Sequence, residues 1–164
     1  MFYYSTDFMF NPTYIKNFTL VTFNDSKGVS CINGSSDTIF DLEKLMVTFA
    51  IKRKSNQNLA EFDQTIIQGK IDTCKIGEGM FGSYILTSLM ADFTKYSNFQ
   101  LTCPHKKGFL YLSNFPRVDE SVFPSFVPKQ KTLFELTVVC MAKLPKRPKL
   151  ASFLSLKVYG IIFA

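Results

Sequence analysis

The sequence predicts a mainly β protein, a sandwich of antiparallel strands with one α-helix at about residues 80–96 between two cysteines. Three observations lead to this fold class. About seven or eight short segments rich in apolar, aromatic and β-branched residues are separated by clusters of turn-forming residues. One stretch has the apolar period of a helix. Strand-like and helix-like segments do not alternate, so nothing indicates a parallel sheet built from βαβ units.

The first half of the chain holds most of the strand-like segments. A strand or loop is expected at Phe2–Phe10, and strands are expected at Tyr14–Phe23, Val29–Ile32, Leu45–Lys52 and Phe62–Ile71. Turn clusters at Asn24–Gly28 and Asn33–Asp37 enclose the third of these segments. The residues Arg53–Leu59 are polar and predict a hairpin loop. Strict alternation predicts one common face for Leu45, Val47, Phe49 and Ile51.

The helix prediction depends on large apolar residues at three- and four-residue steps, which are Phe81, Ile85, Leu89, Phe93 and Tyr96. Glycines before them mark the start, and Pro104 cannot continue a helix. Cys74 and Cys103 lie on either side of this segment. A disulfide between them would fix both ends of the helical segment to a sheet, with a loop-closure contribution of roughly 3 to 4 kcal/mol.

Three further strands are expected after the second cysteine, at Gly108–Phe115, Thr132–Ala142 and Phe153–Phe163. Residues 119–131 contain two prolines and no steady period, so they predict a loop, although an unusually apolar one. A basic, proline-interrupted connection follows at 143–149. Gly160 lies within the last strand and is interpreted as a candidate β-bulge.

Length and composition limit the possible classes. At 164 residues, the chain is predicted to form a single domain over residues 1–164 with a real core. It has 18 Phe and 7 Tyr but no Trp, so aromatic rings should dominate the buried area. A net charge of +6 suits many partners and identifies none, and no nucleic-acid partner is expected. No run of about 18 apolar residues occurs, so no membrane span is expected.

Three glycosylation triplets, beginning at Asn17, Asn24 and Asn33, lie close together in the first third of the chain. Together with the paired-cysteine interpretation, they favour an extracellular, secreted protein. Residues Met1–Phe10 lack the basic start and apolar run of a signal peptide. We therefore expect that the signal has been removed or omitted, and the alternative is a cytosolic protein.

Signals for catalysis are few, and a non-enzymatic protein without a cofactor is expected. His105 is the single histidine and lies beside Pro104, which favours a structural or solvated role over that of a general base. Neither a Gly-x-Ser-x-Gly turn nor a phosphate-binding loop is present. The four cysteines lack Cys-x-x-Cys spacing, so no metal site is predicted.

Three features suggest binding instead. The aromatic content is high for a tightly packed sandwich, the amphipathic helix must cover something, and the loop at 119–131 is apolar. Together they fit two sheets splayed around an apolar cavity, with the helix and loop at its mouth. The alternative interpretation is an ordinary phenylalanine-rich core.

Four short motifs carry a resemblance to a known family, and they are Asp72-Thr73-Cys74-Lys75, Tyr96-Ser97-Asn98, Thr102-Cys103-Pro104 with Gly108, and Lys157-Val158-Tyr159-Gly160. In this order and at these separations they resemble an insect family of small secreted proteins. That family is catalogued as a domain of unknown function, is grouped with the ML-type lipid-recognition proteins and includes the chemosensory B-type proteins. The similarity extends from about Asn11 to the C-terminus.

The resemblance implies an immunoglobulin-like β-sandwich that binds a lipid or other apolar molecule between its sheets. It also implies a signal peptide, an extracellular location and a disulfide between Cys74 and Cys103. Relatives usually carry a further cysteine pair near the N-terminus. This chain offers Cys31 and Cys140, which either pair with each other or remain free thiols.

We therefore expect a secreted, non-enzymatic protein that binds a lipid or other small hydrophobic ligand, in chemosensation or lipid transport. The alternative is a secreted glycoprotein that acts as a protein-interaction partner or co-receptor and has no ligand cavity; a receptor protein is the second kind of partner considered. The candidates for lining the cavity are inward-facing residues of strands and helix: Val47, Phe49, Phe81, Ile85, Leu89, Phe93, Leu110, Leu112, Leu136, Val138, Leu154 and Leu156. The alternative is that the opposite face of a strand points inward, and this shift of one residue would replace half of the set.

Overall fold

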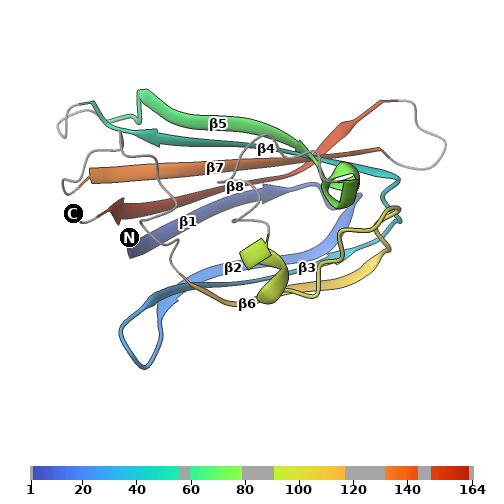
Figure 1. Cartoon of the computed structure of the whole chain (residues 1–164), viewed down its shortest axis with the longest axis horizontal. Helices are drawn as coiled ribbons and strands as arrows, with labels where there is room; N and C mark the ends of the chain where they lie inside the picture. Colours follow the sequence, from blue (N-terminus) through green and yellow to red (C-terminus); the bar gives the residue numbers. More distant parts are fainter. Residues whose placement is uncertain (1, 56–59, 79–90, 117–131, 144–148, 163–164) are drawn as a thin grey trace.

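The chain folds into two antiparallel sheets that face each other (Figure 1). The computed structural model describes residues 2–55, 60–78, 91–116, 132–143 and 149–162. The five-stranded sheet has the order β1-β8-β7-β4-β5 and the three-stranded sheet the order β2-β3-β6. The elements are β1 (Phe2–Phe10), β2 (Ile15–Asn24), β3 (Ser30–Thr38), β4 (Lys44–Arg53), β5 (Gln64–Asp72), the 3₁₀-helix η1 (Thr73–Glu78), β6 (Gly108–Pro116), β7 (Thr132–Lys143) and β8 (Ala151–Ile162). The predicted antiparallel β-sandwich is confirmed.

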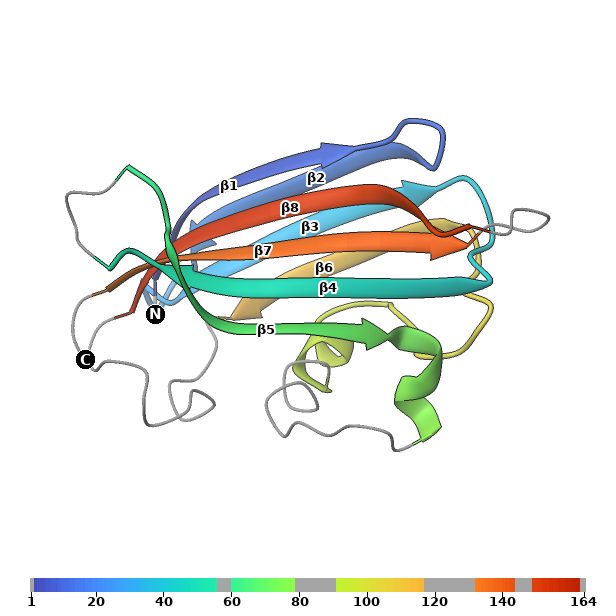
Figure 2. The ribbon, with the colours of Figure 1, turned by 90° about the horizontal axis from the view of Figure 1, so that it is seen from above.

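The alternation of apolar residues decides which face of each strand is inside. In β4, Leu45 and Ile51 are buried, and Val47 and Phe49 share their face because side chains of a strand alternate. β4 pairs continuously with β7, where Ile51 lies opposite Leu136. The predicted common face of β4 is therefore the inner face of the sandwich. The strands of the two sheets lie along roughly the same axis (Figure 2).

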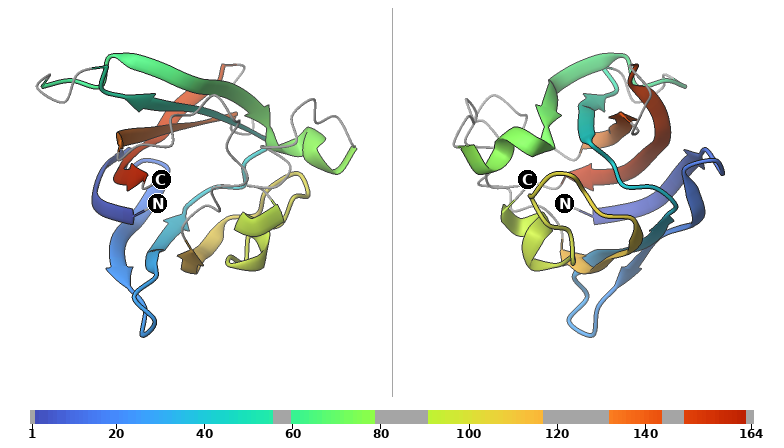
Figure 3. Two further views of the ribbon diagram at one scale, coloured as in Figure 1. Left: turned by 60° about the vertical axis from the view of Figure 1, so that its left-hand side comes forward. Right: turned by 90° about the vertical axis from the view of Figure 1, so that its right-hand side faces the viewer.

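The two sheets are joined at one edge by consecutive strands. β1 belongs to the five-stranded sheet and β2 to the three-stranded one, and a turn from Asn11 to Tyr14 connects them. The backbone N–H of Tyr3 donates to Ser30 Oγ at 2.9 Å, which links β1 to β3. η1 and the short helical segment at 91–95 lie at the opposite edge, beside β5 and β6 (Figure 3).

The helix expected at about 80–96 is observed only in part, because residues 91–95 are helical and residues 79–90 lie outside the described residues. Tyr96 lies in the turn that ends the helix, where its N–H donates to the Phe93 carbonyl, and it begins the segment that leads to Cys103. That segment covers the outer edge of β6: the N–H of Ser113 donates to the Tyr96 carbonyl, and the Asn98 side chain bonds the backbone of Phe109 and Tyr111. The Asn98 amide thus takes the place of a neighbouring strand for this part of β6.

Two local predictions are wrong. Asn33–Asp37 is not a turn but the second half of β3, whose residues pair with β2 on one side and β6 on the other. Pairing on both sides overrides the turn propensity of these residues. Gly160 is not a bulge either, since β8 keeps a continuous register with β7 through it, and the nearby irregularity lies in β1 between Tyr3 and Ser5.

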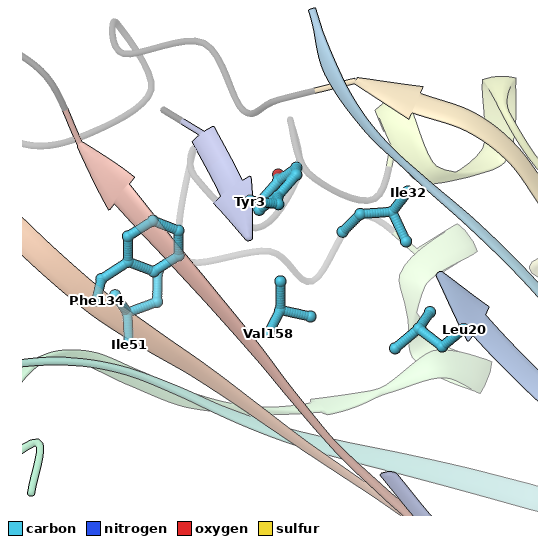
Figure 4. Close-up of a cluster of buried hydrophobic side chains, with 6 residues drawn as sticks. All are labelled: Tyr3, Leu20, Ile32, Ile51, Phe134 and Val158. Atoms are coloured by element: carbon cyan, nitrogen blue, oxygen red, sulfur yellow. The ribbon is translucent and has the colours of Figure 1, made fainter. Parts of the chain in front are cut away.

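The buried apolar side chains form two separate clusters. The first contains Tyr3, Leu20, Ile32, Ile51, Phe134 and Val158, which converge from both sheets (Figure 4). The second contains Tyr14, Ile15, Leu42, Leu45, Ala142 and Phe153. One end of β4 and β7 contributes to the first cluster, and the other end of these strands contributes to the second. Each cluster therefore packs one end of the sandwich. Within the described part of the chain, every helix is too short or too polar to span a membrane.

Candidate functional site

A band of half-buried apolar residues lies between the two clusters, on the inner faces of the sheets. Along β4, Leu45 and Ile51 at the two ends are buried, whereas Val47 and Phe49 between them remain partly exposed. β7 repeats this pattern, because Phe134 and Ala142 are each 1% exposed and the inner residues between them are not fully covered. The middle of the inner face is therefore less covered than its ends.

The described strand residues predicted to line a cavity all belong to this half-buried band, and they are Val47, Phe49, Leu110, Leu112, Leu136, Val138, Leu154 and Leu156. Some of them pack against one of the two end clusters. Phe49, Val138 and Leu110 pack against neither. Phe49 pairs with Val138, which in turn pairs with Leu156, so these three side chains form one rung across the centre of the sheet.

Gly69 of β5 continues this rung beyond Phe49. A Cβ atom at Gly69 would lie 2.6 Å from Cε1 of Phe49, so the ring occupies the space that a side chain on β5 would need. The absence of a side chain at Gly69 therefore decides how the Phe49 ring lies across the sheet.

The helical candidates are only partly described. Phe81, Ile85 and Leu89 lie outside the described residues. The Phe93 ring makes edge-on contacts with Phe99 and Phe115, at centroid distances of 5.8 and 6.3 Å. Phe115 of β6 packs against the first cluster, so the helical segment at 91–95 covers the β6 edge of the sandwich.

A hollow of about 510 Å³ occurs on the opposite, outer face of the five-stranded sheet. Among the residues that line it, Thr48, Lys70 and Val139 lie side by side in the register of β4, β5 and β7. They alternate with the inner-face residues of the same strands, so this hollow is not the cavity that the sequence predicts between the sheets.

A disulfide between Cys74 and Cys103 connects η1, directly after β5, to the segment that precedes β6, with the two Cα atoms 5.4 Å apart. It therefore joins the two sheets at the edge opposite β1 and β2. Cys31 and Cys140 are free thiols. Cys31 alternates with the inward-facing Ile32 and so lies on the outer face of its sheet, whereas Cys140 lies on the inner face of the other sheet, and the two thiols cannot meet.

His105 lies beside this disulfide and is buried. Its backbone pairs with Leu42, and its ring stacks on Phe99 at 4.9 Å. Nδ1 lies 3.2 Å from the carbonyl oxygen of Gln100, and Nε2 lies 2.7 Å from Thr73 Oγ1. Burial lowers the pKa of the ring below its usual 6.5, and the bond to Gln100 acts in the opposite direction.

Sequence reasoning missed the partner of this histidine. Thr73 is 1% exposed at the start of η1, and its hydroxyl also donates to the Leu45 carbonyl at 3.0 Å. The only available signal was that Thr73 stands directly before a cysteine. Nothing in the sequence relates it to a histidine 32 residues away.

Comparison with known proteins places the chain in one family. A search of curated proteins finds no match. The family model described as "Protein of unknown function (DUF1091)" matches residues 47–134, which run from the half-buried band of β4 through the disulfide to β7. Because this match covers more than half of the 164 residues, the chain belongs to the DUF1091 family, a family of unknown function.

Proposed function

We propose that this protein is a secreted, non-enzymatic binder of a lipid or another small hydrophobic molecule, in chemosensation or lipid transport, and that the ligand lies between the two sheets. The half-buried central rung of Phe49, Val138 and Leu156 carries the proposal. These apolar side chains are on inner faces but retain accessible surface. Each CH₂ group of a ligand buried against them would contribute about 0.8 kcal/mol.

Cys140 supports this placement. Burial raises the pKa of its thiol to about 12. Cys140 pairs with Val47 of β4 and Leu154 of β8, so it lies on the inner face beside two half-buried apolar residues. Its own partial exposure adds to that of the half-buried band.

Secretion is supported by the disulfide between Cys74 and Cys103 and by the exposure of two glycosylation candidates. Asn17 and Asn24 are exposed on β2, so either could carry a glycan without disturbing the core. Asn33 lies in the central strand of its sheet and accepts a hydrogen bond from the Asn114 backbone through Oδ1. Its Nδ2 atom remains on the outer face of β3.

A second candidate function is that of a protein-interaction partner with a dry core. Phe109 and Tyr111 favour it, because they are 64% and 44% exposed on the outer face of β6. Exposed aromatic side chains of this kind are common at protein–protein interfaces. The first function requires an apolar ligand between the sheets, whereas the second requires that side chains alone fill that space.

Native mass spectrometry of protein secreted from insect cells, followed by displacement of an apolar fluorescent probe by oleate, tests the proposal. Val138→Trp places a large ring in the central rung, whereas Val139→Trp places the same ring on the outer face one residue away. We expect Val138→Trp to weaken probe binding at least tenfold. This loss is comparable to the transfer free energy of one apolar side chain from water to a buried site. Val139→Trp should leave it unchanged.

A copurifying lipid or oleate-displaceable probe binding that is lost only in Val138→Trp supports the proposal. No copurifying ligand and no probe binding would favour the interaction function instead. In that case Val138→Trp should lower the urea midpoint strongly, because a dry, closely packed core does not accommodate an added indole ring.

A further inference from the structure

The junction at the β5–β6 edge brings together the donor atoms of a soft-metal site. Sγ of Cys74, Sγ of Cys103 and a ring nitrogen of His105 all lie within 4.8 Å of one another. Cys103 Sγ and His105 Nε2 are 3.5 Å apart. Two ligands bound tetrahedrally to one zinc ion, with Zn–S near 2.3 Å and Zn–N near 2.0 Å, stand at about this separation.

The Nδ1 side of the His105 ring has the kind of partner that zinc-binding histidines usually have. The Gln100 carbonyl oxygen can only accept, so the bond of 3.2 Å places the ring hydrogen on Nδ1 and leaves Nε2 as the acceptor. Histidines that bind zinc usually donate their other N–H to a carbonyl or carboxylate in this way. Stacking on Phe99 fixes the plane of the ring.

The Thr73 hydroxyl, which is the present partner of His105 Nε2, also lies within reach of the Leu45 carbonyl oxygen. Thr73 has one hydroxyl hydrogen, and both Nε2 at 2.7 Å and the Leu45 carbonyl oxygen at 3.0 Å lie within reach of it. With the ring neutral, one hydrogen therefore serves two buried acceptors. A metal ion on Nε2 would allow the hydroxyl to donate wholly to Leu45.

We propose that the reduced form of this protein binds one zinc ion through Cys74, Cys103 and His105, with the fourth position open to water or another ligand. In the reduced protein, zinc replaces the disulfide as the link between η1, directly after β5, and the segment before β6. This inference does not depend on hydrophobic-ligand binding, because all three residues lie at the sheet edge and none belongs to the central rung.

The chemistry requires a reductant, which is a dithiol in a cell or a phosphine in the test tube. With a phosphine, the S–S bond breaks and phosphorus is oxidised to the phosphine oxide, with oxygen from water. The two hydrogens of that water finish on the two sulfurs. Zinc then replaces both thiol protons and releases them to solvent. Cys103 is exposed, so a reductant can reach the S–S bond.

The test uses a Cys31→Ser/Cys140→Ser background, in which the two remaining thiols are those of the junction. The full-length protein is reduced with a phosphine, and zinc and then cobalt are added. We expect one zinc ion per chain by native mass spectrometry, with loss of two protons. With cobalt we expect thiolate-to-metal absorption and the strong visible bands of tetrahedral coordination, together with a near-UV circular dichroism spectrum like that of the oxidised protein.

Two variants separate a ligand from a merely structural histidine. His105→Asn should weaken zinc binding at least about tenfold, since loss even of an outer-shell partner costs about 10- to 100-fold. Thr73→Val removes the other partner of the ring and should leave zinc binding equal or tighter. If His105 acted only through its contact with Thr73, both variants would weaken binding alike, and the proposal would be wrong.

Other outcomes also decide the matter. No zinc bound by the reduced background protein, or equal binding by the oxidised protein, overturns the proposal. A reduced protein that loses its near-UV spectrum and does not regain it with zinc overturns it as well. Recovery of the spectrum on addition of one equivalent of zinc supports it.

Discussion

Replacing Gly160 by alanine tests the packing of the first cluster at its most crowded point. Gly160 of β8 lies opposite Phe134 of β7, whose side chain is 1% exposed. A Cβ atom at position 160 would lie 2.4 Å from Cε1 and Cζ of that ring and 2.7 Å from the backbone oxygen of Phe2. All three distances are shorter than real Cβ contacts, so something must move.

The expected loss follows from these contacts. Overpacking of a closely packed core costs about 1–3 kcal/mol, and this site belongs at the upper end because a backbone oxygen and a buried ring both resist movement. Replacing glycine also reduces the conformational entropy of the unfolded chain, which stabilises the folded state by about 0.4–1 kcal/mol. The free energy of unfolding of Gly160→Ala should therefore fall by about 2 kcal/mol. With a urea slope of about 2 kcal/mol/M, the midpoint should fall by about 1 M.

Gly34→Ala is the matched control. Its added Cβ would lie 3.2 Å from Cδ1 of Leu20, the far end of a flexible side chain, and 3.3 Å from the Thr19 carbonyl oxygen. We expect a loss below about 1 kcal/mol. Urea unfolding followed by circular dichroism measures both variants. A Gly160→Ala variant within about 0.5 kcal/mol of the parent, or no less stable than Gly34→Ala, would refute the packing of Phe134 over Gly160.

Three more predictions follow from the charged, thiol and glycosylation groups. Burial lowers the pKa of His105, so the folded state favours its neutral ring. The contribution of His105 to stability is therefore present above pH 6.5 and is lost as the pH falls below that value. The urea midpoints at pH 7.5 and 5.5 should differ less in His105→Gln than in the parent protein. With a pKa of about 12, the Cys140 thiol should resist iodoacetamide at pH 8 in the native protein and react in urea, and equal rates by mass spectrometry would contradict its burial. In protein secreted from insect cells, Asn17→Gln and Asn24→Gln should each remove the mass of one N-linked glycan, and an unchanged intact mass would contradict glycosylation at that site.

The strands could be predicted because the period of apolar residues is a local property. In β4 and β6 the alternation of apolar residues predicted the position of the strand and the residues that share a face, and in β7 and β8 the apolar, β-branched composition predicted the position. In β3, the residues Asn33–Asp37 have turn propensity, and the strand there depends on β2 and β6, which are distant in sequence. A local pattern contains no information about such neighbours.

The candidate site divides in the same way. The strand residues proposed to line the space between the sheets lie on inner faces, as a period of two requires. That they are only half-buried depends on how far the opposite sheet covers them, which no single segment specifies. The contact of Thr73 with His105 depends on two single residues brought together by β5 and the segment before β6. The spacing of cysteines and histidine in the sequence therefore gave no sign of three donor atoms in one place.

The division of the core into two clusters separates the residues that hold the chain together from those that shape its interior. Phe134, Ile15 and their neighbours at the two ends carry the close packing, so substitutions there should be strongly disfavoured. Phe49 and Val138 of the central rung pack against neither cluster, so small substitutions there leave both ends intact and should cost little stability. Related chains could therefore diverge widely in the lining between the sheets while keeping one common framework.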